Sequence, residues 1–331
     1  MRKYGFNMLW SFYYSGSDAA PPDEKQLDFI AKRGFNYIRV PMDYRFWTKD
    51  FNYFNPDEKV FEKFDSYLAA CRQRSLHMTL NLHRAPGYCI NNNDIERHNL
   101  WKDKEAQDAF VFIWETFARR YKGVSSEALS FDLLNEPPNI GQYSFTRKRH
   151  ERVMRRAIEV IRDIDPNREL ILNGIEGGGT AIPELADVGA VHSGRGYTPF
   201  AVSHHRASWV QVGDGYEWET PVYPGVSDGE IWDKTKLEEH YKPWRKVEDM
   251  GVDIHIGEFG CYNKTPNEVA MRWLRDLLGL FHEYKWGYAL WNFAGDFGIV
   301  DHGRPGTKYE LIEGYKVDRE LLELLLQSRA E

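Results

Sequence analysis

Short apolar or β-branched runs alternate with longer amphipathic segments along the whole chain. The short runs predict strands at Tyr4–Leu9, Tyr37–Val40, His77–Leu82, Leu129–Leu134, Leu170–Asn173, either Val188–His192 or Gly196–Val202, Val252–Ile256 and Gly287–Trp291. The amphipathic segments predict helices at Asp23–Lys32, Pro56–Arg74, Lys104–Tyr121, Phe145–Ile164, Thr235–Met250, Asn267–Tyr284 and Arg319–Gln327. The helical signal after the fifth strand is weak and covers Ile182–Asp187. This alternation indicates an α/β protein.

Eight strand signals, each followed by a helix, divide the 331 residues into units of 331/8, about 41 residues, which suits a (β/α)₈ barrel. A doubly wound open sheet is the alternative, and it should carry a glycine-rich phosphate turn after an early strand. Gly177-Gly178-Gly179 follows the fifth strand instead and lacks the GxGxxG spacing. Since no linker or repeat is visible, we predict a single (β/α)₈ TIM barrel domain over residues 1–331. The long irregular stretch Gly194–Trp232 predicts a functional loop.

Charge and apolar run lengths narrow the possible partners. With 43 Lys+Arg against 50 Asp+Glu, the net charge is −7 and the pI is near 5.9, which argues against a nucleic-acid binder. No apolar stretch reaches the ~20 residues that span a bilayer. The apolar run at the start of the chain is too short for a signal peptide. We therefore expect a soluble cytoplasmic protein without membrane contact, unless a leader has been removed. The three scattered cysteines are typical of a protein in a reducing compartment. The sequence does not predict an oligomeric state.

Aromatic residues make up 15% of the chain and include 11 Trp. Sugar rings stack on indoles, so carbohydrate is a candidate ligand, and a core rich in Trp is the alternative. Tryptophans near strand ends or in loops are candidate sugar contacts: Trp10, Trp47, Trp101, Trp209, Trp218 and Trp232. Tryptophans in helical or strand-entry segments are expected in the core: Trp114, Trp273 and Trp286.

Catalytic groups of a barrel lie at the carboxyl ends of its strands, where the sequence places Arg39, His83, Asn135-Glu136, Glu258 and Trp291-Asn292. The two glutamates are 258 − 136 = 122 residues apart, about three βα units, and so follow strands four and seven. Glycosidic bond cleavage needs two carboxyl groups, one to protonate the leaving oxygen and one to attack or stabilise the anomeric carbon. A separation of about 5–5.5 Å gives retention and about 6.5–9.5 Å gives inversion.

Five motifs in order carry a resemblance to a known family. They are Ile38-Arg39-Val40-Pro41, Asn81-Leu82-His83-Arg84-Ala85-Pro86-Gly87-Tyr88, Leu134-Asn135-Glu136-Pro137, Ile256-Gly257-Glu258-Phe259-Gly260 and Trp291-Asn292-Phe293. Together they resemble glycoside hydrolase family 5. The resemblance implies Glu136 as acid/base and Glu258 as nucleophile, with Arg39 orienting Glu258 and Asn135 binding the neighbouring sugar hydroxyl. It also implies that His83 lines the subsite, that Trp291 forms its stacking floor, and that a retaining mechanism needs no metal or organic cofactor.

One position departs from the family pattern. The family usually has His-x-Tyr after strand six, and here Arg195-Gly196-Tyr197 places Tyr197 as expected but Arg195 where the histidine should be. A fixed positive charge close to Glu136 would lower the pKa of that carboxyl and weaken it as an acid. The alternative is that the alignment slips and that His192, His204 or His205 takes the role of the histidine.

We expect a retaining β-glycosidase that hydrolyses β-linked gluco- or manno-oligosaccharides, with exo-action on short chains as a β-mannosidase or β-glucosidase. The alternatives are an endo-β-1,4-glucanase (cellulase) or endo-β-mannanase, and a carbohydrate-binding barrel without activity, which Arg195 favours. Metal-dependent hydrolysis is a third hypothesis. His204-His205 gives it little support, because adjacent residues of a strand point to opposite faces. Gly225-Val226-Ser227-Asp228-Gly229 matches GxSxG but lacks the strand and helix that a nucleophile elbow requires.

Overall fold

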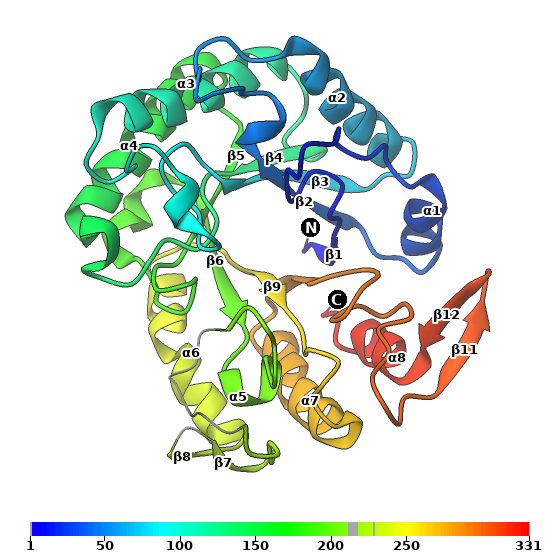
Figure 1. Ribbon diagram of the computed structural model, residues 1–331. Coiled ribbons are helices and arrows are strands. Elements are labelled where there is room, and N and C mark those ends of the chain that lie inside the picture. The colour runs from blue at the N-terminus through cyan, green and yellow to red at the C-terminus, as the bar shows by residue number, and fades with distance from the viewer. Residues whose placement is uncertain (1, 211–217, 228, 331) are drawn as a thin grey trace. The chain divides into compact units, whose positions relative to one another are not determined.

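The computed structural model describes residues 2–210, 218–227 and 229–330. Eight parallel strands form a closed barrel in the order β1-β10-β9-β6-β5-β4-β3-β2. Figure 1 labels these strands and the helices. Their bounds are β1 Tyr4–Asn7, β2 Tyr37–Asp43, β3 His77–Arg84, β4 Leu129–Asp132, β5 Glu169–Asn173, β6 Val191–Gly196, β9 Ile254–Phe259 and β10 Gly287–Leu290. The predicted (β/α)₈ TIM barrel is confirmed.

The helices are α1 Glu24–Lys32, α2 Glu58–Arg72, α3 Lys104–Arg120, α4 Arg147–Ile164, α5 Phe200–Ser203, α6 Lys234–Glu248, α7 Asn267–Glu283 and α8 Arg319–Gln327. All seven strong helical patterns match a helix, with ends that differ by at most two residues. Side-chain caps fix several starts, since Asp23, Asp57, Thr146 and Asp318 each accept a hydrogen bond from a first-turn N–H. Among the described residues, no helix is both long and apolar enough to cross a membrane.

Several sequence predictions were wrong or incomplete in their local details. The sixth strand, Val191–Gly196, only overlaps the two candidate ranges, and α5 occupies the end of the second one. The weak helix after β5 is a 3₁₀ segment, Pro183–Val188. Two antiparallel pairs were not predicted: β7 Gly225–Ser227 with β8 Glu230–Trp232, and β11 Tyr309–Ile312 with β12 Tyr315–Asp318. The sequence of β6, VHSGRG, has no apolar run, so its strand conformation depends on pairing with neighbouring strands rather than on propensity.

The described chain divides into two compact units. The larger unit comprises Met8–Gly194 and Lys246–Ile254, and the smaller unit comprises Met1–Asn7, Arg195–Arg245 and His255–Glu331. The single domain over residues 1–331 stays a prediction.

The strands of the larger unit are buried on both faces, but the two faces differ in chemistry. Side chains alternate along a strand, so Leu129 and Phe131 of β4 share one face while Ser130 and Asp132 share the other. The apolar face packs on α3, where the Trp114 ring lies 5.2 Å from the Phe131 ring, centroid to centroid. The polar face carries a hydrogen-bonded layer, including the hydroxyls of Thr79 and Ser130 at 2.6 Å. Two residues predicted to bind substrate, Arg39 of β2 and His83 of β3, continue this polar layer.

A buried arginine joins three elements of the larger unit. Arg168, at the start of β5, is fully buried and donates hydrogen bonds to the carbonyl oxygens of Leu129, Tyr121 and Val124. It also forms an ion pair with Asp165 at 2.7 Å. The guanidinium therefore ties the end of α3 and the start of β4 to β5, and its removal would leave these acceptors and one carboxylate without their partner.

We expect Arg168→Met to lower the free energy of unfolding by about 3 kcal/mol, because breaking a buried ion pair leaves uncompensated polar groups. The matched control is Arg119→Met, which breaks an exposed α3 pair with Glu115 whose arginine is 67% exposed. Its cost should stay below about 1 kcal/mol. Urea unfolding followed by tryptophan fluorescence measures both variants. Equal midpoints for the two variants would show that the Arg168 network adds no more stability than an exposed ion pair.

Candidate active site

Glu136 lies just after β4, in a backbone conformation that few residues adopt. Its φ is 45°, in the left-handed region, and hydrogen bonds hold the segment there. The Asn135 N–H donates to the Leu82 carbonyl at 3.0 Å, and the Glu136 N–H donates to Asn173 Oδ1 at 3.2 Å. The Tyr88 hydroxyl donates to the Glu136 carbonyl at 2.6 Å. The backbone of Glu136 is therefore held by the carbonyl of Leu82 on β3 and by two buried side chains, Asn173 and Tyr88.

A buried network connects Asn135 to the polar layer of the strands. Arg39 forms an ion pair with Asp132 at 2.8 Å, and its Nη2 donates to Asn135 Oδ1 at 2.8 Å. Asn173 Nδ2 donates to the other oxygen of Asp132 at 2.6 Å. With its carbonyl oxygen bound to Arg39, Asn135 turns its amide nitrogen toward His83, at 3.5 Å from Nε2. The network brings together three residues that the sequence placed in the site: Arg39, Asn135 and His83.

Glu258 lies on β9 in the smaller unit, and each of its carboxylate oxygens has a partner. The Tyr197 hydroxyl donates to Oε2 at 3.2 Å, and Arg195 Nη2 lies 3.4 Å from Oε1. Both Glu258 and Arg195 are only 3% exposed. A guanidinium at this distance favours the ionised carboxylate. We expected the charge of Arg195 beside Glu136, whereas the structure places it in contact with the other candidate carboxylate.

A glycine makes this contact possible. A side chain at Gly196 would place its Cβ 2.6 Å from Phe259 Cβ, so only glycine fits where β6 approaches β9. Arg195 and Tyr197 flank this glycine and therefore share the opposite face of the strand. That face carries both side chains to Glu258, the residue before Phe259.

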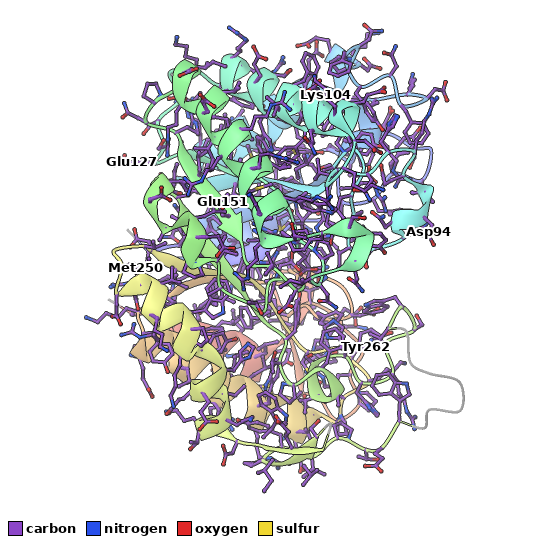
Figure 2. All side chains as sticks on the ribbon, turned by 90° about the vertical axis from the view of Figure 1, so that its left-hand side faces the viewer. Asp94, Lys104, Glu127, Glu151, Met250 and Tyr262 are labelled. Atoms are coloured by element: carbon purple, nitrogen blue, oxygen red, sulfur yellow. The ribbon has the colours of Figure 1, made fainter. Side chains whose placement is uncertain are left out.

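Trp291 follows β10, and its N–H donates to the Phe259 carbonyl at 2.8 Å. Its partly buried indole packs, together with Tyr197 and Val210, against a buried cluster of Ala207, Tyr262 and Phe297. Trp209, which is 50% exposed, packs edge-on against Tyr262 at 5.0 Å between ring centroids (Figure 2 labels Tyr262). We call Tyr197, Trp209, Tyr262, Trp291 and Phe297 the aromatic cluster. It contains a half-exposed indole, Trp209, a partly buried one, Trp291, and Tyr197, which donates to Glu258.

Three histidines were candidates for the missing family histidine. Burial lowers the pKa of His204 to about 3, so its ring is neutral, and it packs edge-on against Tyr197 at 4.9 Å. His205 packs against the Trp218 ring at 5.5 Å, and burial also lowers its pKa. His192 lies in the core of the larger unit, 3.3 Å from the Leu185 carbonyl, with its pKa lowered to about 4 by burial. Only His204 of the three packs on a partner of Glu258. Within the described ranges, no three His, Cys, Asp or Glu residues are grouped so that they could hold a metal ion.

More of the tryptophans are buried than the sequence predicted. Trp209 and Trp218 are accessible, but four other candidates are buried packing residues: Trp10, Trp47, Trp101 and Trp232. Trp47, for example, lies among the rings of Phe61, Phe64 and Phe117. The core assignment of Trp114, Trp273 and Trp286 is confirmed.

Sequence reasoning missed Asp132, Asn173 and Tyr88, the residues that hold the Arg39 and Glu136 segments. Asp132 and Asn173 are polar residues at the carboxyl ends of their strands, and that signal was available in the sequence. Tyr88 lies in a motif that was recognised, but its hydrogen bond to the Glu136 carbonyl depends on the conformation of the loop after β3.

A (β/α)₈ barrel with one carboxylate after β4 and another on β9 has the groups that glycosidic bond hydrolysis requires. The model of the family cellulase (glycosyl hydrolase family 5) matches residues 2–296. The chain therefore belongs to glycosyl hydrolase family 5 and is a glycoside hydrolase.

Similar proteins agree with this assignment. A solved glycoside hydrolase is 59% identical, covers all of both chains and has a TM-score of 0.98. Endoglucanase C of Acetivibrio thermocellus is 29% identical over 315 residues, which are 87% of this chain and 89% of that protein. Endoglucanase Cel5A of Thermotoga maritima has the same fold, with 24% identity, a TM-score of 0.77 and coverage of 98% of this chain and 96% of its own.

We expect Gly196→Ala to destabilise the protein by about 1–3 kcal/mol, because the new methyl group must displace Phe259. The matched control is Gly279→Ala in α7, where a Cβ meets nothing within 4 Å. That change should stabilise the helix by about 0.5–1 kcal/mol, since alanine is the better helix former. Urea unfolding of both variants measures these values. A stabilising Gly196→Ala change would contradict the close approach of β6 to β9.

Proposed function

We propose that the protein is a retaining endo-β-1,4-glucanase that hydrolyses β-1,4-linked glucan chains by double displacement. The observation that carries the proposal is the environment of Glu258: a buried carboxylate with a fixed cation on one oxygen and a phenol on the other. These partners favour the anion that a covalent nucleophile needs. The family membership supports the same assignment.

In the proposed first step, a Glu258 oxygen bonds to the anomeric carbon while the glycosidic bond breaks and Glu136 gives its proton to the leaving oxygen. In the second step, Glu136 takes a proton from water, the water oxygen bonds to the anomeric carbon, and the bond to Glu258 breaks. Asn135 and His83 are proposed to bind hydroxyl groups of the reacting sugar, and Trp291 to stack beneath it. Arg39, which pairs with Asp132 and donates to Asn135, is proposed to hold the Asn135 amide in position for this role.

The relatives favour endo-action on glucan over the exo-mannosidase expected from the sequence. Endoglucanase C and Cellodextrinase A of Ruminococcus flavefaciens, which is 25% identical over 274 residues, are both named for glucan-derived substrates. The aromatic cluster supports a substrate of several sugars, because Trp209 offers a second accessible indole besides Trp291. A site for one terminal sugar needs a single such floor.

We expect Glu258→Ala to reduce turnover of cello-oligosaccharides by at least about 10⁴-fold, because the covalent step loses its nucleophile. Azide should fill the space left by the carboxylate and give a glycosyl azide of the opposite anomeric configuration, detected by mass spectrometry. A folded Glu258→Ala variant with unchanged activity would contradict the assignment.

We expect Glu136→Ala to lose about 10²–10⁴-fold in kcat/KM on cello-oligosaccharides but little on dinitrophenyl β-cellobioside, whose leaving group needs no proton. The matched control is Glu176→Ala, since Glu176 also follows a strand and also has a positive φ, 57°, but is exposed. That variant should keep both activities. An equal loss of Glu136→Ala on both substrates would argue against its role as the acid.

We expect cellohexaose digestion to give internal cleavage products first, with cellobiose, cellotriose and cellotetraose appearing together. Chromatography of early time points distinguishes this from stepwise release of single sugars, which would support exo-action instead. Manno-oligosaccharides of the same length, assayed in parallel, test the sugar preference.

A further inference from the structure

We propose that Arg195 is a positioning residue for Glu258, which keeps the attacking carboxylate ionised and oriented in place of the histidine of the family pattern. The inference rests on the proposed function and concerns the same site. Arg195 occupies the position where this chain departs from the family motif, and its side chain contacts Glu258.

The structure fixes Arg195 tightly in relation to Glu258. The backbone carbonyl of Arg195 accepts a hydrogen bond from the Tyr241 hydroxyl at 3.0 Å, and the next residue, Gly196, approaches Phe259 too closely for any side chain. The guanidinium is buried and lies 3.4 Å from Glu258 Oε1. Because an arginine does not lose its proton in a protein, this charge is constant across the working pH range, unlike that of a histidine.

The Tyr197 hydroxyl and the His204 ring also lie near Glu258, and neither carries a charge. Tyr197 donates a neutral hydroxyl to Oε2. His204 is close enough for the Glu258 charge to raise its pKa slightly, but burial dominates and keeps the pKa at about 3, so the ring is uncharged. Arg39 lies in the larger unit, pairs there with Asp132, and is unchanged in every variant below.

The charge of Arg195 has a different effect in each chemical step. Before attack it holds Glu258 as the anion, so the reaction continues at lower pH. In the second step the bond between Glu258 and the anomeric carbon breaks and the electron pair returns to the carboxylate, where the guanidinium stabilises it. Loss of Arg195 should therefore narrow the pH range on the acid side and slow the breakdown of the glycosyl-enzyme.

The test is the pH dependence of inactivation by dinitrophenyl 2-deoxy-2-fluoro-β-cellobioside. Dinitrophenolate leaves without a proton, so the rate reports attack by Glu258 alone. In Arg195→Met, the acid limb of this profile should move up by about one to three pH units, the usual effect of an adjacent opposite charge. Arg195→Lys keeps a cation and should restore most of the original limb. Breakdown of the trapped enzyme in the presence of cellobiose should be slower in Arg195→Met.

The matched control is Arg304→Met, which removes another buried arginine of the same unit. Arg304 is buried and donates to the Cys261 carbonyl at 2.7 Å. The proposal gives it no part in holding Glu258. Its acid limb should coincide with that of the unmodified enzyme. A shift in Arg304→Met equal to that in Arg195→Met would attribute the effect to general loss of packing and overturn the proposal.

An unshifted acid limb in folded Arg195→Met would also overturn the proposal and make Arg195 a packing residue. Arg195→Gln, which keeps a hydrogen-bond donor without charge, provides the same comparison if the methionine variant unfolds. Failure of the proposed function looks different, because the unmodified enzyme would then form no covalent adduct on Glu258 at any pH.

Discussion

A charge buried without a partner costs about 3–5 kcal/mol, a large share of the free energy that keeps a domain folded, and this constraint governs both units of the structure. Parallel strands buried on both faces leave no solvent for the charged side chains that catalysis requires. Such side chains therefore form buried ion pairs. Arg39 pairs with Asp132 in the larger unit, and Arg195 pairs with Glu258 in the smaller one.

The pairing also gives each side chain a fixed direction. Asp132 is held by Arg39 and Asn173, and Asn173 in turn accepts the backbone N–H of Glu136. The strained backbone at Glu136 is thus supported by groups that are themselves satisfied, which is how a costly φ angle persists at a functional position. In the smaller unit, Gly196 has the same supporting role, because it sets the approach that brings Arg195 and Tyr197 to Glu258.

Much of the fold was predictable because its signals are local. The helices have amphipathic patterns and capping residues, and strands such as His77–Arg84 carry regular alternation. The polar residues at the ends of the strands could likewise be predicted as site residues, because the strand pattern before each of them is local. Strand β6 could not be placed, because its Ser, Gly and Arg residues have no strand propensity and pair only within the assembled sheet.

The partners of the candidate residues were less predictable than the residues themselves. Nothing local in the sequence reveals that Arg195 contacts Glu258, since the contact depends on how closely two strands approach. Similarly, Trp47 and Trp209 both lie in turns. Trp47 is nevertheless buried among phenylalanines, whereas Trp209 is half exposed. Burial of that kind is a property of the assembled fold.

The most direct test of the account is the anomeric configuration of the first product. Proton NMR during cellohexaose hydrolysis shows whether the new reducing end appears as the β or the α anomer before the two interconvert. Double displacement through Glu258 predicts the β anomer first. Initial release of the α anomer would mean inversion, and Glu258 would then not be a covalent nucleophile.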